Sequence, residues 1–304
     1  MELVIDPCDI CNLQCPLCPT GQGSANRSKG RMSFDNFRKI IDELGPYLYR
    51  VDLHNWGEPL LNDEIYSMIS YAHTNNIEVR VSSNFNVINQ VKAEKLVKSG
   101  LDVLIVSLDG ASPETYVKYR VGGSFDKVTS GIKMVSELKT KLKTLKPVII
   151  LQFLVMRHNE HEISLVKGIA DELGANQVDL WSIRCDMGRE IFWDDKTRLE
   201  KTANWLPRNE DFCVYDLKTG ARKRHSANCN FLWVQSAINW NGSVSPCCAS
   251  YNEAYDFGNA FEIGFKNVWN NDKYRQAREI VRTKKFNKSD LQNVCYYCVK
   301  NGFF

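Results

Sequence analysis

Three cysteines stand close together near the start of the chain, in the segment Cys11-Asn12-Leu13-Gln14-Cys15-Pro16-Leu17-Cys18. The spacing of three and then two residues lets three thiolates converge on one inorganic core. Cysteine thiolates hold iron–sulfur clusters, and a set of three leaves one iron open to a substrate or cofactor. A structural zinc ion needs four protein ligands, and Cys8 could supply the fourth. On the thiols alone, both metals stay open.

A second group of cysteines lies near the other end of the chain. Its members are Cys229, Cys247, Cys248, Cys295 and Cys298. Disulfides are disfavoured in a reducing compartment, where clustered cysteines more often bind metal. Asn241-Gly242 predicts a hairpin with a type I′ turn, which brings Cys229 and Cys247 together, and the tail adds two more thiols. Four cysteines suit zinc as well as an iron–sulfur cluster.

Alternating strands and helices must position the first group. The predicted strands are residues 2–7, 50–55, 77–82, 101–108, 147–156 and 177–183, and the predicted helices are 34–44, 63–74, 91–99, 125–140 and 160–173. Ser33 is the expected N-cap of the first helix. Six such units imply a parallel sheet with right-handed crossovers. Periodicity allows an open doubly wound sheet or a partial barrel, and in both the site lies at the carboxyl ends of the strands.

The pattern changes in the second half of the chain. Residues 184–228 lack a clear period and are interpreted as a bridge. Strands 231–240 and 243–246 then flank the hairpin signal, and a helix is expected over 265–282. The chain is therefore predicted to hold two structural units, one for each cysteine group.

The Cys-x3-Cys-x2-Cys motif and the first 180 residues resemble the radical S-adenosylmethionine superfamily. The resemblance implies an α/β fold, a partial (β/α)6 TIM-like barrel over residues 1–183. It implies a catalytic 4Fe–4S cluster on Cys11, Cys15 and Cys18, with the amino and carboxylate groups of S-adenosylmethionine on the open iron. Reductive cleavage then gives methionine and a 5′-deoxyadenosyl radical that takes a hydrogen atom from substrate.

The same resemblance implies cofactor contacts at the ends of the strands. Trp56-Gly57-Glu58-Pro59 is similar to the family's GGE-type motif, with Trp56 in place of the first glycine, and would hold the methionine ammonium. Further expected contacts to S-adenosylmethionine are Ser83, Asn84, Ser107, Asp109, Arg120 and Gln152. Ser and Asp before Gly are also ordinary turn residues, and Arg120 could be a surface arginine. His54 could touch substrate or be a satisfied polar neighbour.

The spacing Cys229-x12-Gly242-x4-Cys247, followed by Cys295-x2-Cys298, resembles the SPASM module or its shortened twitch form. The full module needs about seven cysteines, and this chain has five there and ends shortly after Cys298. The resemblance therefore favours a small Cys-rich α+β, twitch-like domain over residues 229–304. It implies one auxiliary 4Fe–4S cluster on these four cysteines. Cys248 is either a catalytic hydrogen-atom donor or a small buried thiol.

Composition and family together suggest a function. A net charge of +3 gives no argument for nucleic acid, no apolar run reaches a membrane span, and an acidic N-terminus excludes a signal peptide, so a cytoplasmic protein is expected.

Related enzymes with one auxiliary cluster suggest a small alcohol-bearing substrate, an aminosugar, cyclitol or other carbohydrate, that is epimerised or oxidised by two electrons. A flavodoxin- or ferredoxin-type protein would donate electrons. The alternatives are radical modification of a ribosomally made peptide and a non-enzymatic zinc- or cluster-bearing binding protein.

Overall fold

The computed structural model describes residues 1–185, 193–223 and 229–303. A sheet of eight strands forms the centre of this part of the chain, in the order β6-β5-β4-β3-β2-β1-β7-β8. The strands are β1 (Glu2–Ile5), β2 (Arg50–Asp52), β3 (Glu78–Ser83), β4 (Val103–Ser107), β5 (Val148–Val155), β6 (Gln177–Ser182), β7 (Gln235–Ile238) and β8 (Val244–Ser245). Strands β1 to β7 pair in parallel with their neighbours, and β8 runs antiparallel to β7.

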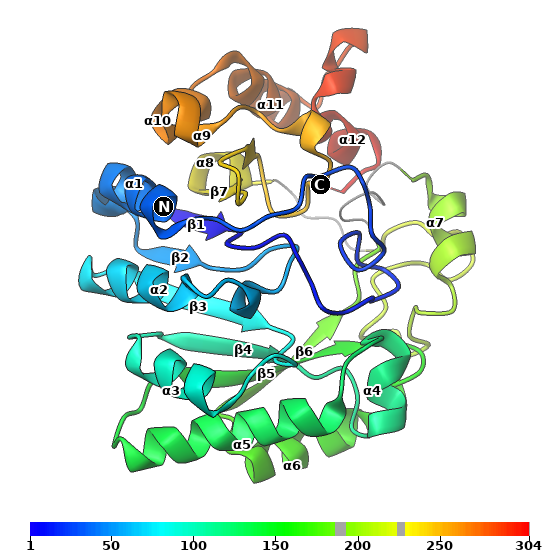
Figure 1. Cartoon of the computed structure of the whole chain (residues 1–304). Coiled ribbons are helices and arrows are strands. Elements are labelled where there is room, and N and C mark those ends of the chain that lie inside the picture. Colours follow the sequence, from blue (N-terminus) through cyan, green and yellow to red (C-terminus); the bar gives the residue numbers. More distant parts are fainter. Residues whose placement is uncertain (186–192, 224–228, 304) are drawn as a thin grey trace.

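The first six strands follow one another in chain order across the sheet (Figure 1). A doubly wound sheet would reverse this order part-way, so the structure selects the partial barrel. Its outer face is covered by α1 (Phe34–Leu44), α2 (Ile65–Thr74), α3 (Gln90–Lys98), α5 (Phe125–Lys141) and α6 (Ile163–Leu173). Val51, Val79 and Leu104 pack into the core beneath these helices. Because side chains alternate along a strand, their neighbours in sequence face the inside of the barrel.

Helix ends follow local signals in the sequence. The Ser33 side chain accepts a hydrogen bond from Asn36 N and starts α1, as predicted. The sequence analysis missed α4 (Pro113–Tyr119), a short helix capped by Ser112. No helix in the described residues combines the length and the apolar character that crossing a membrane requires.

The C-terminal segment differs from the predictions in two helices. Residues 231–240 were predicted as one strand, but they begin as the short helix α8 (Phe231–Val234) before β7. The predicted helix 265–282 is two helices, α10 (Phe265–Trp269) and α11 (Asp272–Thr283). The break arises because the Asn271 side chain accepts a hydrogen bond from Tyr274 N, which starts a new helix.

The hairpin between β7 and β8 forms with a different turn from the one predicted. Gly242 has a φ of +83°, whereas Asn241 is not among the residues with positive φ. Gly242 N donates to the Asn239 carbonyl over 2.8 Å. This is the three-residue hairpin loop with glycine in the left-handed region, and the predicted type I′ turn, which needs two positive φ angles, is wrong.

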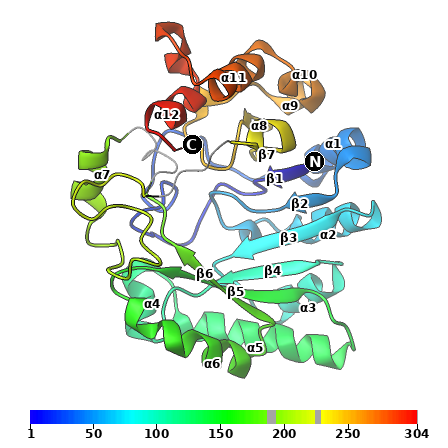
Figure 2. The ribbon, with the colours of Figure 1, turned by 180° about the vertical axis from the view of Figure 1, so that it is seen from behind.

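The C-terminal segment continues the sheet of the barrel. β7 pairs in parallel with β1, from Glu2 opposite Gln235 to Ile5 opposite Ile238, and both views place it directly beside β1 (Figure 2). The segment interpreted as a bridge contains a helix, α7 (Asp195–Thr202). The domain limits at residues 183 and 228 stay a prediction, because one sheet runs through both units.

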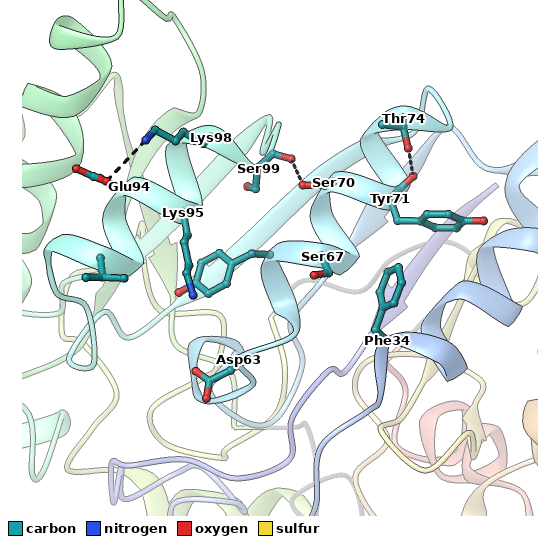
Figure 3. Close-up of a pocket in the computed structure, with 12 residues that line it drawn as sticks. Phe34, Asp63, Ser67, Ser70, Tyr71, Thr74, Glu94, Lys95, Lys98 and Ser99 are labelled. Atoms are coloured by element: carbon teal, nitrogen blue, oxygen red, sulfur yellow. Dashed lines mark hydrogen bonds and ion pairs between the residues drawn. The ribbon is translucent and has the colours of Figure 1, made fainter.

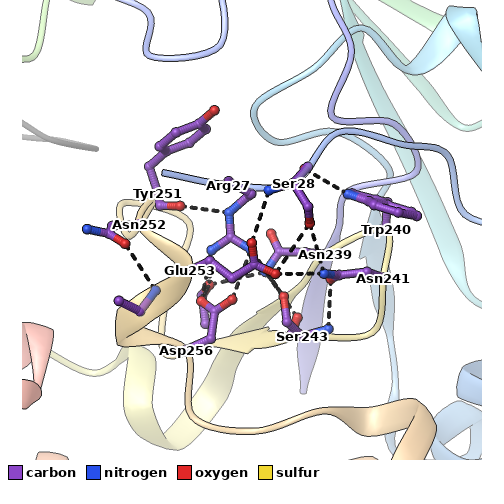
Figure 4. Close-up of polar contacts among 12 residues, drawn as sticks. Arg27, Ser28, Asn239, Trp240, Asn241, Ser243, Tyr251, Asn252, Glu253 and Asp256 are labelled. Atoms are coloured by element: carbon purple, nitrogen blue, oxygen red, sulfur yellow. Dashed lines mark hydrogen bonds and ion pairs between the residues drawn. The ribbon is translucent and has the colours of Figure 1, made fainter. Parts of the chain in front are cut away.

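A buried charge pair ties the loop after the first cysteine group to the C-terminal hairpin (Figure 4). The Arg27 side chain is fully buried and donates to both carboxylate oxygens of Asp256, over 2.8 and 2.9 Å. It also donates to the Tyr251 carbonyl at 2.7 Å and to the hydroxyls of Ser243 and Ser245 at 3.1 and 3.4 Å. Both cysteine groups are thereby held on one scaffold.

Candidate functional site

The loop after β1 brings Cys11, Cys15 and Cys18 to one cavity of about 250 Å³ at the carboxyl ends of the strands. Burial raises the pKa of Cys11 to about 12, and the charges of Cys15 and Cys18 add to the shift. Nη1 of Arg120 lies 3.9 Å from Cys15 Sγ, and Nδ2 of Asn84 lies 3.6 Å from Cys11 Sγ. The three thiols are therefore close enough for the charge of one to change the pKa of another, and two of them have a side-chain N–H donor nearby. Ligands of one shared core have such surroundings.

Tight backbone contacts hold this loop in shape. A side chain at Gly21 would place its Cβ 2.7 Å from the backbone N of Cys15, so only glycine fits there. Gln14 N donates to the Val121 carbonyl at 2.9 Å and Cys18 N to the Cys15 carbonyl at 3.1 Å. These bonds fix the direction in which the three thiols point.

Cys8 does not join the other three thiols. It is buried, it donates to the Ile10 carbonyl at 3.6 Å, and it does not line the cavity. Among the described residues, no three His, Cys, Asp or Glu side chains are arranged to hold a single metal ion. A core several atoms wide fits such thiols better than one zinc ion does, because zinc needs four sulfurs about 2.3 Å from a single point.

Glu58 organises the wall next to the cysteine loop. Its buried carboxylate accepts hydrogen bonds from Ser83 Oγ at 2.7 Å and Leu60 N at 3.0 Å on Oε1, and from Asn84 N at 2.7 Å on Oε2. Burial raises the pKa of Glu58, and these bonds oppose the shift. A carboxylate has about four acceptor positions, so one position on Oε2 is left for a ligand.

The rest of the Trp56-Gly57-Glu58-Pro59 motif divides between the cavity and the packing around it. Trp56 and Gly57 line the cavity, and Pro59 is buried outside it. A Cβ at Gly57 would lie 1.7 Å from the Cys8 carbonyl oxygen, so the close approach of two loops requires glycine there. Pro59, predicted as a cofactor contact, instead starts the short helix η2 (Pro59–Leu61).

Asp109 and Arg120 form an ion pair at the opposite wall. Arg120 Nε lies 2.6 Å from Asp109 Oδ2, and Leu154 N donates to Asp109 Oδ1 at 2.7 Å. Asp109 is fully buried and does not line the cavity, whereas Arg120 does. Both carboxylate oxygens hold protein groups, and Asp109 orients Arg120. The contact between Asp109 and the cofactor stays a prediction.

The remaining predicted contacts come from the ends of β3, β4 and β5. Ser83, Asn84 and Ser107 line the cavity. Gln152 pairs with Ser107 in register but does not line this cavity, so its contact with the cofactor stays a prediction. Cavity-lining residues that the sequence analysis missed, apart from His54, are Leu13, Leu17, Gly21, Asn55, Ser82, Tyr119, Leu154 and Arg184. Of these residues, only Asn55 and Ser82 had a signal in the sequence, namely their position at the end of a strand.

The structure also brings four cysteines of the second group together. Cys295 and Cys298 lie three residues apart on α12 (Val294–Lys300), on one face of that helix. Burial raises the pKa of Cys295, and the charges of Cys298, Cys247 and Cys229 raise it further. None of the eleven cysteines, all of which the structure describes, is in a disulfide. The four thiols suit a second metal centre.

Cys248 lies between this group and the barrel. Burial raises the pKa of its thiol, and a hydrogen bond with its own backbone opposes this shift. The charge of Asp52 raises the pKa further, and that of Arg184 lowers it. Asp52 is the last residue of β2 and faces the inside of the barrel. Cys248 is partly buried and does not itself line the 250 Å³ cavity.

A larger hollow, of about 790 Å³, lies on the outside of the barrel between α2 and α3 (Figure 3). Tyr66 and Lys95 both line it, and Lys95 Nζ lies over the Tyr66 ring, 5.6 Å from the ring centre. No cysteine lines this hollow. The cavity at the strand ends is therefore the candidate site.

Comparison with known families agrees with this placement. A model described as "Radical SAM superfamily" matches residues 5–163, and one described as "Iron-sulfur cluster-binding domain", named SPASM, matches residues 229–299. The chain is 23% identical to the AdoMet-dependent heme synthase of Methanosarcina barkeri, over 95% of this chain and 88% of that protein.

Two solved structures show the same fold. Streptococcus suis SuiB bound to its precursor peptide SuiA superposes with a TM-score of 0.66 at 17% identity, over 97% of this chain and 70% of SuiB. BtrN in complex with AdoMet and 2-DOIA superposes with a TM-score of 0.55 at 16% identity, over 92% of this chain and 86% of BtrN.

These matches bear on the cofactors and on the family. The two domains bind a catalytic 4Fe–4S cluster, auxiliary iron–sulfur centres and S-adenosylmethionine. The donors found at the two cysteine groups fit such centres. The chain belongs to the radical S-adenosylmethionine superfamily and carries a C-terminal SPASM iron–sulfur domain.

Proposed function

We propose that this radical S-adenosylmethionine enzyme acts on a small alcohol-bearing substrate, an aminosugar, cyclitol or other carbohydrate, and epimerises it or oxidises it by two electrons. When bound, the catalytic cluster and S-adenosylmethionine supply a 5′-deoxyadenosyl radical that removes a hydrogen atom. The protein must then bind the substrate, keep water out and, for epimerisation, return a hydrogen atom.

The inner wall of the barrel carries this proposal. Asp52 and Arg80 are register partners on β2 and β3, and His54 and Ser82 follow two residues later toward the cavity. The inward-facing positions of β4 and β5 include the register partners Ile105 and Ile150. Ser107 and Gln152 follow two residues later on the same face, so the inside of the barrel offers polar groups beside apolar ones. A carbohydrate ring, with hydroxyl groups at its edge and C–H groups on its faces, matches such a mixed lining.

The residues around the cavity have proposed roles toward the cofactors. Cys11, Cys15 and Cys18 hold the catalytic cluster. The free acceptor position on Glu58 binds the methionine ammonium, and Arg120, oriented by Asp109, binds the carboxylate. A flavodoxin- or ferredoxin-type protein supplies the electron.

The second cysteine group has a proposed role in the outcome of the reaction. Cys229, Cys247, Cys295 and Cys298 hold one auxiliary 4Fe–4S cluster. In a two-electron oxidation, this cluster would accept the second electron from the substrate. Cys248 is near enough to Asp52 for the charge of Asp52 to raise its pKa, and it is the proposed hydrogen-atom donor for epimerisation. A thiol suits this role, because a closed site excludes water and the donor must belong to the protein.

The test begins with a panel of aminosugars and cyclitols given to the anaerobically reconstituted enzyme with dithionite. The expected result is a substrate-dependent rise in 5′-deoxyadenosine. The reaction is then run in deuterated water, where epimerisation places solvent deuterium at the attacked carbon and Cys248→Ala abolishes that product. An oxidised product without deuterium would assign the reaction to oxidation. No rise with any member of the panel would contradict the substrate class.

A second candidate, modification of a ribosomally made peptide, is favoured by one observation. Trp181 on β6 is 52% exposed and is in register with Leu154, which lines the cavity. An exposed aromatic ring at the edge of the site suits a peptide side chain. The superposition with SuiB, whose structure holds a precursor peptide, agrees with this candidate. Formation of 5′-deoxyadenosine only with a peptide would select it.

A further inference from the structure

Two residues that follow β2 line the cavity, and each carries a buried side-chain N–H group that has no hydrogen-bond partner. Asn55 Nδ2 is buried without a hydrogen-bond partner, and so is the neighbouring indole Nε1 of Trp56. A buried donor without an acceptor costs about 1–3 kcal/mol. Such a cost in a cavity wall points to a ligand that completes the hydrogen bond.

His54 adds a third donor to the same wall. Its Nδ1 accepts a hydrogen bond from Ser82 N at 3.2 Å, which places the proton of the neutral ring on Nε2. Burial lowers the pKa of His54 to about 4, with Arg80 and Arg50 contributing, so the ring is neutral at pH 7. No described residue accepts a hydrogen bond from Nε2.

The charges around these donors balance one another. Arg50 pairs with Glu2 and lies 3.5 Å from Asp52, and Arg80 is the register partner of Asp52. Two cations therefore stand beside two carboxylates on this wall. A wall without excess positive charge, lined by neutral N–H groups, is suited to a neutral oxygen rather than to a carboxylate or phosphate.

We propose that His54 and Asn55 form an oxygen-recognition subsite, which binds a hydroxyl or amide carbonyl oxygen of the substrate inside the barrel. This inference rests on the proposed function for the presence of a substrate in this cavity. A hydroxyl oxygen and an amide carbonyl oxygen can both accept a hydrogen bond from these two donors. The experiments below separate the two sources.

The first experiment compares two buried asparagines and needs no substrate. Asn62 is the matched control, because its Nδ2 donates to the carbonyls of Pro7 and Met32, both at 2.8 Å. Asn62→Leu is expected to lower the Tm of the reconstituted protein by several degrees, since it leaves two carbonyls unpaired. Asn55→Leu is expected to keep or raise the Tm, because it removes a donor that has no acceptor. A fall in Tm for Asn55→Leu would overturn the subsite.

The second experiment measures binding of three probes to the holoenzyme: myo-inositol for hydroxyls, N-acetylalanine methylamide for an amide carbonyl, and glucuronate for a carboxylate. At least one neutral probe is expected to bind, and Asn55→Leu is expected to weaken it by about tenfold, equivalent to about 1.4 kcal/mol. Binding of the amide alone would support the subsite and contradict the alcohol substrate. Tighter binding of glucuronate than of myo-inositol would overturn the subsite, and so would the absence of binding for all three probes. So would a tenfold loss of S-adenosylmethionine affinity in Asn55→Leu, because Asn55 would then be a cofactor contact.

Discussion

Arg27 and Asp256 are 229 residues apart in the chain, yet the guanidinium of one donates to both carboxylate oxygens of the other. Both side chains are almost completely buried. The pair joins the loop that follows the first cysteine group to the strand region that precedes α9 (Ala260–Ile263). Figure 4 shows this pair together with the contacts of Ser28 to Trp240, Asn241 and Glu253 across the same junction.

Breaking this pair should destabilise the whole protein. Arg27→Met leaves the Asp256 carboxylate buried without its cation, which costs about 3–5 kcal/mol. Urea unfolding of the metal-free protein measures the loss. Arg38→Met is the control, because Arg38 pairs with Asp35 on the exposed surface of α1, and such a pair contributes about 0–1 kcal/mol. Equal effects of the two substitutions would contradict the role given to Arg27.

Cys15→Ala should abolish cleavage of S-adenosylmethionine. Losing one of three thiolates leaves an iron without its protein ligand and exposes the core to solvent. Iron and sulfide analysis should still find the C-terminal centre, since Cys229 and its partners are untouched. Normal 5′-deoxyadenosine production by this variant would show that the three cysteines are wrongly assigned.

Glu58→Ala should weaken binding of S-adenosylmethionine by roughly ten- to hundredfold. A hydrogen bond to a charged group contributes roughly 1.5–3 kcal/mol, and the variant also loses the bonds that hold Ser83 and Asn84. An anaerobic titration measures the dissociation constant. Glu64→Ala is the control, because Glu64 accepts a hydrogen bond from Phe34 N and does not line the cavity. Unchanged affinity for Glu58→Ala would place the ammonium elsewhere.

Asp6 should make stability fall as pH rises between about 4 and 7. Burial, with the nearby charge of Asp9, raises the pKa of Asp6 from 3.8 to about 7. In this window the folded state holds a proton that the unfolded state has released, so raising the pH favours unfolding, by up to about 1.36 kcal/mol per pH unit. Urea unfolding of the metal-free protein at several pH values measures the slope, and Asp6→Asn should flatten it. An unchanged slope would contradict the shift.

The local signals in the sequence located most elements of the barrel. Ser33 acts within a few residues of its position, and the helix that it caps lies where it was expected, as does the strand predicted over residues 77–82, to within one residue. The order of the strands was open, since periodicity does not say which strands are neighbours. The register of β1 with β7 joins residues far apart in the chain, and no local pattern encodes such a pairing.

The site was predictable where one motif held several groups. The cysteines of the first group and Glu58 line one cavity, as the resemblance implied. The role of Asp109 was open, because a carboxylate at a strand end can face a ligand or a neighbouring arginine, and only the three-dimensional structure shows its contact with Arg120. Arg27 gave no signal, since its partner is encoded more than two hundred residues later.

The pairing of β1 with both β2 and β7 has a consequence for biosynthesis. β1 leaves the ribosome before the other strands of this sheet, but its second neighbour, β7, begins 233 residues later (235 − 2). At about 5–20 residues per second, one edge of β1 stays bare for on the order of ten to fifty seconds. During that time the nascent chain presents an open strand edge, which other chains can occupy. Cys11, Cys15 and Cys18 follow β1 in the chain, so these thiols also leave the ribosome long before β7 can pair with β1.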